Sequence, residues 1–317
     1  MTSAPRRRRS RRPLGALVAL ALVACVVGVA AISADALGTG RLFDRVVARV
    51  DRFMAGPVPE RPAPVTVLVS DPPEETDAPE ASPTVTAGAS STLASPAPGA
   101  TALPSATPIP RRPVNVDIVN DHAAVFAHEL KVTWCASAGV QMTLAILRLG
   151  DTSNAFQRTI QGRVGEWESA ADSHNGDWGP SAMALALDAY GAKGYQVRAY
   201  RSRQGALRDA ARAIEKTHSP VLLLAWRGAH TWLMTGFRAD ADPALFSNAK
   251  ISGTYILDPW YPDVSSIWGP SDPPGTFQDN AEMIRNYLPW KRPEGHYAER
   301  DGLFIAVVPT IVVTPAQ

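Results

Sequence analysis

The stretch Thr-Trp-Cys-Ala-Ser-Ala-Gly-Val-Gln-Met, residues 133–142, decides how the folded part of this chain is organised. Its small and apolar residues recur at helical spacing and predict a buried helix over 135–149. Cys135 lies at the start of this helix and is the one cysteine outside the apolar N-terminal segment. Backbone N–H groups at a helix start stabilise a thiolate and lower the pKa of a cysteine. The position therefore predicts a reactive thiol, although a lone cysteine beside a tryptophan is more often a core residue.

The N-terminus has the composition of an export or anchoring signal. Six arginines fall among the first twelve residues, and the nineteen residues 14–32 carry no charge. This length suffices for one membrane-spanning helix, and the arginines predict an N-terminus that stays inside. The sequence therefore predicts a basic cytoplasmic tail over 1–13 and a single transmembrane anchor over 14–35. The rest of the chain is expected outside the cell membrane.

Parts of the same N-terminal segment also resemble three other kinds of export signal. Ala34-Asp35-Ala36 could be a signal-peptidase site that releases a secreted protein. Leu22–Cys25 resembles a lipobox, and Ser10–Leu14 resembles a twin-arginine signal. Apolar residues continue beyond Cys25, which favours the uncleaved anchor. Each alternative exports the remainder of the chain.

A linker of two sections follows. In the juxtamembrane section, 36–56, apolar side chains over 40–54 recur at helical spacing. They predict an amphipathic helix that lies on the membrane, pairs with a copy of itself, or continues the spanning helix. Residues 57–113 hold fourteen of the 28 prolines and no aromatic residue. Such a segment cannot bury enough apolar surface to offset its ordering entropy, so it predicts an extended, disordered stalk.

The folded domain is expected over 114–317, which contains all eight tryptophans. Setting aside the six N-terminal arginines changes the net charge from +1 to −5, so nothing predicts nucleic-acid binding. Helices come first and most strands later, which favours an α+β fold. The expected helices are 135–149, 181–190 and 203–216 with Ser202 as N-cap, and the expected strands are Tyr195–Tyr200, Val221–Trp226, Thr231–Phe237, Thr254–Leu257 and Leu303–Val308.

A histidine and an aspartate stand where they could serve the Cys135 thiol. Of the six histidines, only His230 opens an apolar strand after a small turn, and Asp258 ends the next apolar strand. If these strands pair as neighbours, Asp258 can hydrogen-bond the His230 ring, fix its tautomer and stabilise the imidazolium. Taken alone, His230 would be an ordinary strand histidine and Asp258-Pro259 an ordinary strand-ending turn.

The order of these blocks resembles the papain-like cysteine peptidases, most of all the branch related to bacteriocin-leader-processing peptidases. That branch is family thirty-nine of the papain clan, with its extracellular single-domain relatives. The resemblance covers about 120–310 and implies a papain-like fold, with a helical half carrying the cysteine and an antiparallel sheet half carrying histidine and aspartate. The matching blocks are Trp134-Cys135-Ala136 with Ala138, Gln141 and Met142; Trp178-Gly179-Pro180 with Ala184-Leu185 and Tyr190-Gly191; Pro220-Val221 with Gly228, His230, Trp232 and Gly236; and Asp258-Pro259.

The resemblance also implies roles for these residues. Cys135 would be the nucleophile, His230 the base and then the acid, and Asp258 the group that orients His230. The implied reaction is hydrolysis of peptide bonds in an extracytoplasmic protein or peptide through an acyl-thioenzyme, with neither cofactor nor metal. Trp134, Trp178 and Trp232 are expected to border the substrate cleft. His128-Glu129 is not a metal signature, because no second histidine follows at helical spacing.

Glu129 departs from the family pattern. The family usually has a glutamine six residues before the nucleophile, and its amide completes the oxyanion hole with the cysteine N–H. An ionised glutamate only accepts hydrogen bonds and repels the oxyanion, and loss of one donor typically costs ~10²–10³ in rate. Burial could keep Glu129 protonated, or a register shift could supply another donor.

Two other functions stay open. The domain could be a catalytically impaired relative that binds a peptide or a cell-wall component in its cleft. It could also be another acyl-transfer enzyme, such as a wall amidase or transpeptidase. Wall hydrolases usually place Asp before and Ser-Gly after the nucleophile, which Trp134 and Ala136-Ser137 do not match.

Overall fold

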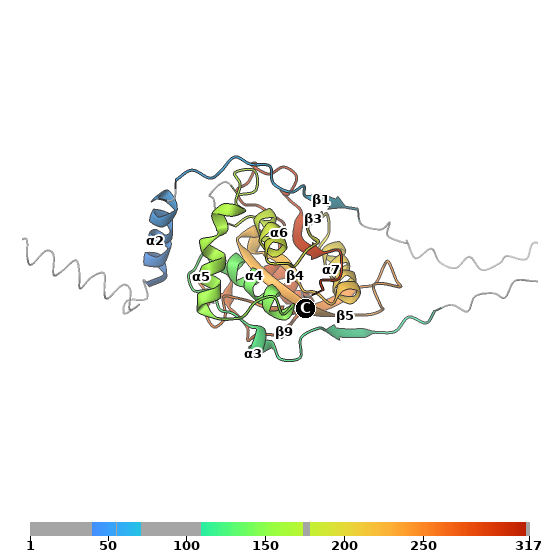
Figure 1. The fold of residues 1–317 in the computed structure, drawn as a ribbon. Helices are drawn as coiled ribbons and strands as arrows, with labels where there is room; N and C mark the ends of the chain where they lie inside the picture. Colours follow the sequence, from blue (N-terminus) through green and yellow to red (C-terminus); the bar gives the residue numbers. More distant parts are fainter. Residues whose placement is uncertain (1–39, 55, 71–108, 174–177, 315–317) are drawn as a thin grey trace, which may run out of the picture.

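The structure, a computed structural model, describes residues 40–54, 56–70, 109–173 and 178–314 (Figure 1). The predicted cytoplasmic tail and transmembrane anchor, and most of the predicted stalk, lie outside these residues. Among the helices of the described ranges, none combines the length and the apolar character needed to cross a membrane.

A single mixed sheet forms the centre of the domain. Its strands follow the order β1-β3-β10-β4-β5-β6-β9, and β2 pairs with the far end of β5, beyond the part that β4 covers. Neighbouring strands are antiparallel except for β1 and β3, which run parallel. The strands are β1 Val67–Val69, β2 Val114–Asp117, β3 Tyr195–Tyr200, β4 Val221–Ala225, β5 His230–Ala239, β6 Ile251–Leu257, β9 Thr276–Asp279 and β10 Phe304–Pro309, with a separate pair of β7 Val264–Ser265 and β8 Gly269–Pro270.

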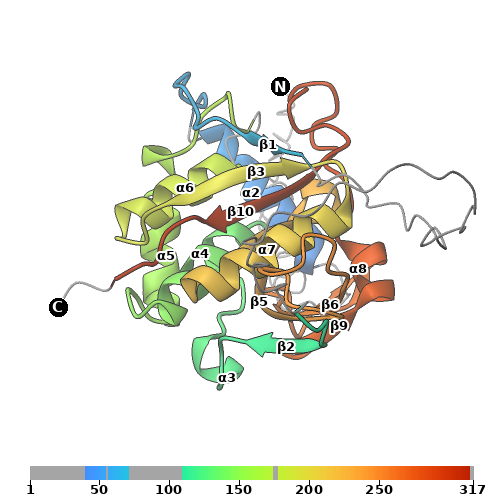
Figure 2. The ribbon, with the colours of Figure 1, turned by 90° about the vertical axis from the view of Figure 1, so that its right-hand side faces the viewer.

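Helices cover both faces of this sheet. Helices α4 (Cys135–Ile146), α5 (Asn154–Gly162) and α6 (Pro180–Ala189) pack around one buried cluster. Helices α7 (Arg203–Thr217) and α8 (Asn280–Asn286) pack into a second cluster on the opposite face. Figure 2 shows α5 and α6 toward one side of the molecule and α8 toward the other. The helices are α2 Gly40–Met54, α3 His122–Val125, α4 Cys135–Ile146, α5 Asn154–Gly162, α6 Pro180–Ala189, α7 Arg203–Thr217 and α8 Asn280–Asn286, with 3-10 turns at Val164–Glu166 and Trp226–Gly228.

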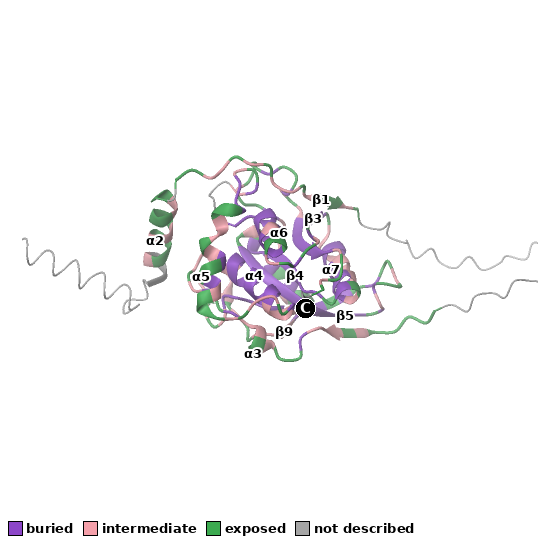
Figure 3. Cartoon of the chain, viewed as in Figure 1, coloured by how far each residue is buried: buried purple, intermediate pink, exposed green. Residues whose placement is uncertain are grey.

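The two clusters arise because strand side chains alternate between faces. In β4, Leu222 and Leu224 join the cluster of α4 and α6, whereas Val221, Leu223 and Ala225 join that of α7. A strand buried on both sides reads as a continuous apolar run, which is the pattern of Val221–Ala225. Figure 3 shows α4 and the central strands as the most deeply buried elements.

The α+β class expected from the order of elements is confirmed. Tyr195–Tyr200 is a strand as predicted, and the Ser202 hydroxyl caps α7 by accepting the Gly205 N–H at 2.9 Å. The helix expected over 135–149 ends earlier, at Ile146, and Arg148 beyond it has a positive φ of 59°. The sequence did not predict α5, α8, β2 or β9.

Residues 57–70 contact the domain in an extended conformation, and we call this segment the strap. Their proline content predicted instead that they belong to the disordered stalk. The Ala170 N–H donates to the Pro59 carbonyl at 3.0 Å, and the Ser181 hydroxyl donates to the Pro64 carbonyl at 3.3 Å. Val67 then begins the pairing of β1 with β3. Prolines lack a donor but keep their carbonyl acceptors, so a proline-rich segment can dock on a surface that supplies donors.

The helix expected over 40–54 is present as α2. Its Arg52 side chain lies 3.3 Å from the Glu168 carboxylate, which ties the helix to the domain. Phe53 and Met54 are largely exposed, at 83% and 76%. Contact of this helix with a membrane or with a second copy stays a prediction.

Gly139 allows α4 to approach the sheet closely. A Cβ at this position would lie 2.9 Å from Cγ2 of Thr231 and 3.1 Å from Cδ2 of Leu222. We expect Gly139→Ala to lower the free energy of unfolding by about 1–3 kcal/mol, because overpacking outweighs the gain in helix propensity. Gly162 ends α5 with open space around it. Gly162→Ala is the matched control and should change stability by less than ~1 kcal/mol. Equal urea midpoints for the two variants would contradict this packing.

Candidate active site

Cys135 is the first residue of α4 and lines a pocket on the domain surface. Trp134 occupies the N-cap position and its carbonyl accepts the Ala138 N–H at 2.9 Å. The residues after Cys135, from Ala136 to Leu144, are all buried, so the helix is fixed in the core while its first residue keeps intermediate exposure. The fold thus holds the thiol at a defined place on the pocket wall.

A left-handed turn delivers His230 to the start of β5. Trp226, Arg227 and Gly228 have φ angles of 50°, 63° and 83°, a region that side-chain-bearing residues rarely adopt. The turn is held from outside, because the Trp226 indole donates to Asn286 at 3.0 Å and the Lys291 N–H donates to the Arg227 carbonyl at 3.1 Å. Strained backbone of this kind persists only where the surroundings enforce it, and it clusters at functional sites.

Asp258 follows β6 and reaches the His230 ring. The pairing of β5 with β6, which the sequence argument took as its condition, is present, with Leu233 opposite Leu257. Nε2 of His230 lies 2.7 Å from Oδ1 of Asp258, and both side chains are buried. The same Asp258 oxygen accepts the Trp260 N–H at 2.9 Å. With Nε2 engaged, Nδ1 is the ring nitrogen left for other partners.

Two tryptophans contact the His230 ring, and a third packs on one of them. The Trp226 ring stacks on the His230 ring with centroids 4.1 Å apart, and the Trp260 ring meets it edge-on at 6.3 Å. Trp268 stacks on Trp226 with centroids 5.7 Å apart. These rings shield the pair of His230 and Asp258 from water, and an aromatic face also stabilises an imidazolium.

Glu129 lies beside the thiol and the imidazole. One carboxylate oxygen of Glu129, Sγ of Cys135 and one ring nitrogen of His230 all lie within 4.8 Å of one another. Glu129 is only 3% exposed, and its backbone N–H donates to the Pro259 carbonyl at 3.0 Å. The three residues come from separate segments of the chain that the fold brings together.

Gln157 on α5 holds the segment that carries Glu129. Its amide nitrogen donates to the His128 carbonyl at 2.9 Å, and its amide oxygen accepts the Leu130 N–H at 2.8 Å. It therefore hydrogen-bonds the backbone on both sides of Glu129. The same amide nitrogen donates to Gln141 of α4 at 2.9 Å. Sequence reasoning missed Gln157 because it did not predict α5, and a glutamine on a short amphipathic helix looks like a surface residue.

The environment raises the pKa of the Cys135 thiol well above its ordinary value. Burial is the largest cause, and the negative charge of Glu129 is the second; hydrogen bonds from Thr231 and from the Ala136 backbone act in the opposite direction but do not compensate. The expectation from the helix start was a lowered pKa, so it is reversed. A helix N-terminus stabilises a thiolate modestly, whereas desolvation can move a pKa by several units.

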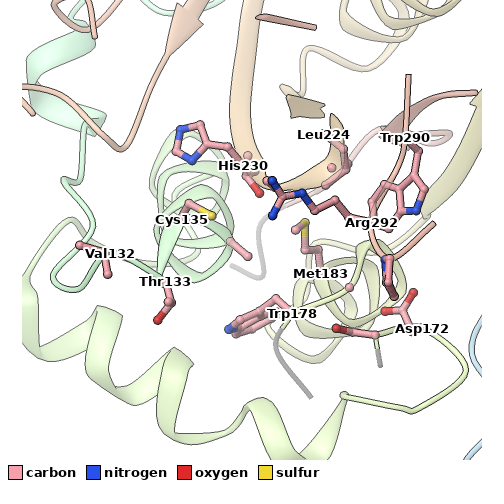
Figure 4. Close-up of a pocket in the computed structure, with 17 residues that line it drawn as sticks. Val132, Thr133, Cys135, Asp172, Trp178, Met183, Leu224, His230, Trp290 and Arg292 are labelled. Carbon is pink, nitrogen blue, oxygen red and sulfur yellow. The ribbon is translucent and has the colours of Figure 1, made fainter. Parts of the chain in front are cut away.

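The pocket has a volume of about 470 Å³ and opens onto Cys135. Figure 4 shows Cys135 and His230 at one end, Trp290 and Asp172 at the other, and the Arg292 side chain extending toward the middle. Of the tryptophans expected at the cleft, Trp178 lines the pocket. Trp134 is the N-cap of α4 with Lys131 over its ring, and Trp232 is buried in the cluster on the opposite face, beside α7.

A scan against protein-family models and searches of curated proteins and solved structures found no match to this chain. Membership of a peptidase family therefore stays a prediction. Function has to be inferred from the geometry around Cys135.

Gln157 tests how firmly this geometry is held. Gln157→Ala would remove the hydrogen bonds to the Leu130 N–H and the His128 carbonyl, both partly buried, at a cost of ~0.5–1.5 kcal/mol for each bond. We expect its urea midpoint to fall accordingly. Gln196 is an exposed glutamine on β3, so Gln196→Ala should stay within ~0.5 kcal/mol of the unchanged protein. If both variants unfold at the same midpoint, the Gln157 contacts do not hold the segment.

The raised pKa of Cys135 predicts a characteristic pH profile of thiol reactivity. Only the thiolate reacts, so alkylation should still be rising at about pH 10, where an ordinary cysteine is almost fully ionised and its reactivity has levelled off. Glu129→Gln removes a negative charge that raises the pKa, and its profile should shift to lower pH. Iodoacetamide labelling with mass spectrometry separates Cys135 from Cys25, the other cysteine. A plateau reached by about pH 9 would contradict the raised pKa.

Proposed function

We propose that this protein is a cysteine peptidase with a papain-like fold, anchored in the cell membrane by its N-terminal segment. Its substrate would be a protein or peptide outside the membrane. One observation carries the proposal. A ring nitrogen of His230 lies within 4.8 Å of the Cys135 sulfur at the pocket wall, and Nε2 of the same ring is hydrogen-bonded to Asp258 at 2.7 Å. A nucleophile, a base and a group that orients the base are the parts that covalent catalysis needs.

The proposed reaction has two halves. In the first, Nδ1 of His230 takes the thiol proton as Cys135 attacks the substrate carbonyl carbon, and the imidazolium then protonates the leaving amine as the C–N bond breaks. In the second, His230 takes a proton from water, the hydroxide attacks the thioester, and the proton returns to sulfur as the acid leaves. Because the pKa of the resting thiol is raised, the proton transfer accompanies the attack instead of preceding it.

Position 129 governs how well the oxyanion is stabilised. The Cys135 backbone N–H supplies one donor, and a Glu129 carboxyl supplies a second only in its protonated form. In its ionised form it places a like charge near the oxyanion. The burial of Glu129 within 4.8 Å of the sulfur therefore also favours the second candidate function, a domain that binds a peptide in the same pocket with little turnover.

Arg292 favours a substrate whose carboxylate lies away from Glu129, the acidic residue beside Cys135. Asp172 lines the pocket, but its charge is balanced by Arg300, which is buried and lies 2.7 Å from it. Arg292 is exposed at the pocket and brings an additional positive charge. Trp178 and Trp290 add apolar walls, and a few polar groups set among apolar walls is the usual make-up of a ligand pocket.

The test measures cleavage and binding with the full-length chain in a mild detergent. Quenched-fluorescent peptides with acidic side chains, and the same peptides with the amide side chains, are incubated with a metal chelator present. We expect cleavage of the acidic peptides, its loss in Cys135→Ala, and a rate increase of up to ~10² in Glu129→Gln through the restored donor.

Each other outcome is informative. If neither the unchanged protein nor Glu129→Gln cleaves, but both bind acidic peptides by fluorescence anisotropy, the binding function replaces the peptidase. Cleavage that survives in Cys135→Ala, or absence of both cleavage and binding, overturns the proposal.

A further inference from the structure

The side chains around Cys135 are also the donor types of a transition-metal site. A carboxylate oxygen from Glu129, a sulfur from Cys135 and a ring nitrogen from His230 lie within 4.8 Å of one another. In the part of the chain that the structure describes, no other group of three such side chains comes this close together. The ligands belong to separate segments, so no spacing motif in the sequence signals them.

We propose that Glu129, Cys135 and His230 bind a zinc ion, with its fourth position open to the pocket. Zinc prefers four tetrahedral ligands at ~2.0–2.3 Å, which places those ligands ~3.5 Å apart. The three atoms are at most 4.8 Å apart, so each pair must approach by at most ~1.3 Å to close around the ion. Thiolate and imidazole select zinc over magnesium or calcium, which take oxygen ligands.

His230 is oriented for this role by Asp258. Metal-binding histidines usually donate their second ring N–H to a carboxylate, which fixes the tautomer and makes the ligating nitrogen more basic. Here Nε2 is bonded to Asp258 at 2.7 Å, so the lone pair of Nδ1 is the one available. Trp226 stacks on the face of the ring, whereas the Nδ1 lone pair lies in the ring plane.

Charge balance points the same way. An ionised Glu129 and a Cys135 thiolate would place two negative charges in one buried site, and the doubly charged ion neutralises both. Zinc must displace the thiol proton, which is released to solvent, so binding should tighten as pH rises.

Zinc binding goes beyond the proposed peptidase and does not depend on it. If the peptidase proposal is also correct, the ion occupies both the nucleophile and the base, so zinc inhibits cleavage and a chelator restores it. The fourth position faces the pocket that Cys135 and His230 line, where water or a substrate carboxylate can reach it.

Cobalt is a suitable probe because it replaces zinc and reports a thiolate ligand. The full-length chain in mild detergent is stripped of metal and titrated with Co²⁺. We expect a thiolate-to-cobalt charge-transfer band that zinc displaces and that Cys135→Ser abolishes. Glu129→Gln and His230→Gln should each weaken zinc binding at least tenfold. Asp258→Asn should weaken it by ~10–100-fold, because Asp258 fixes the tautomer in which Nδ1 of His230 can bind the ion. His218 is an exposed histidine at the end of α7 with a φ of 50°, so His218→Asn should bind as the unchanged protein does.

Two results would overturn the zinc site. One is the absence of the cobalt band; the other is an undiminished affinity in both Glu129→Gln and His230→Gln, which would mean that a thiol alone captures the metal. Circular dichroism is the check that each variant is folded, and Glu129→Gln is nearly isosteric. Because cleavage is measured with chelator present, loss of the zinc site leaves the peptidase test unaffected, and the reverse also holds.

Discussion

The hydrogen bond between His230 and Asp258 constrains the pocket more than any other contact. It is short, at 2.7 Å, and both partners are buried, so removing either partner would leave a polar group in an apolar surrounding at considerable cost. The sheet sets it up, because antiparallel pairing of β5 and β6 brings the start of one strand next to the end of the other. The left-handed turn at Trp226–Gly228 and the stacked indole of Trp226 then fix the ring plane. Which ring nitrogen faces Cys135 follows from this bond.

A second constraint places the thiol and Glu129 against that ring. Gly139 lets α4 approach β5 at the level of Thr231, next in the chain to His230. Gln157 in turn grips the peptide groups around Glu129, and Gln141 links that grip to α4. The pocket is thus assembled where a sheet, a helix and a looped segment meet, each fixed by buried contacts of its own. Precise placement of a few groups by the elements behind them is the general requirement of a functional site.

The sequence could predict the parts of this arrangement that depend on local pattern. The buried helix after Cys135, the strand opened by His230 and the strand ended by Asp258 each have a clear period or boundary, and the pairing of two successive apolar strands is a common outcome. Other parts depend on the assembled fold. The role of Gln157 depends on how α5 packs against the segment that carries Glu129. The strap over 57–70 binds the domain through proline carbonyls, and composition alone does not predict such contacts. The pKa of Cys135 was expected to fall because the helix start is a local feature, whereas burial and Glu129 are contributions of the whole fold.

The charge of Glu129 decides which chemistry the site favours. With Glu129 ionised, the thiol protonated and the imidazole neutral, the three groups together carry one negative charge in a buried place. An oxyanion forming on a substrate adds a second negative charge, which the first one repels. A divalent cation instead takes up the carboxylate charge and, by releasing the thiol proton, a thiolate charge as well. Electrostatics alone therefore favour a cation over an oxyanion beside an ionised Glu129, and a proton on that carboxyl removes much of the preference. The proton on Glu129 is thus the smallest change that converts a site for metal into a site for acyl transfer.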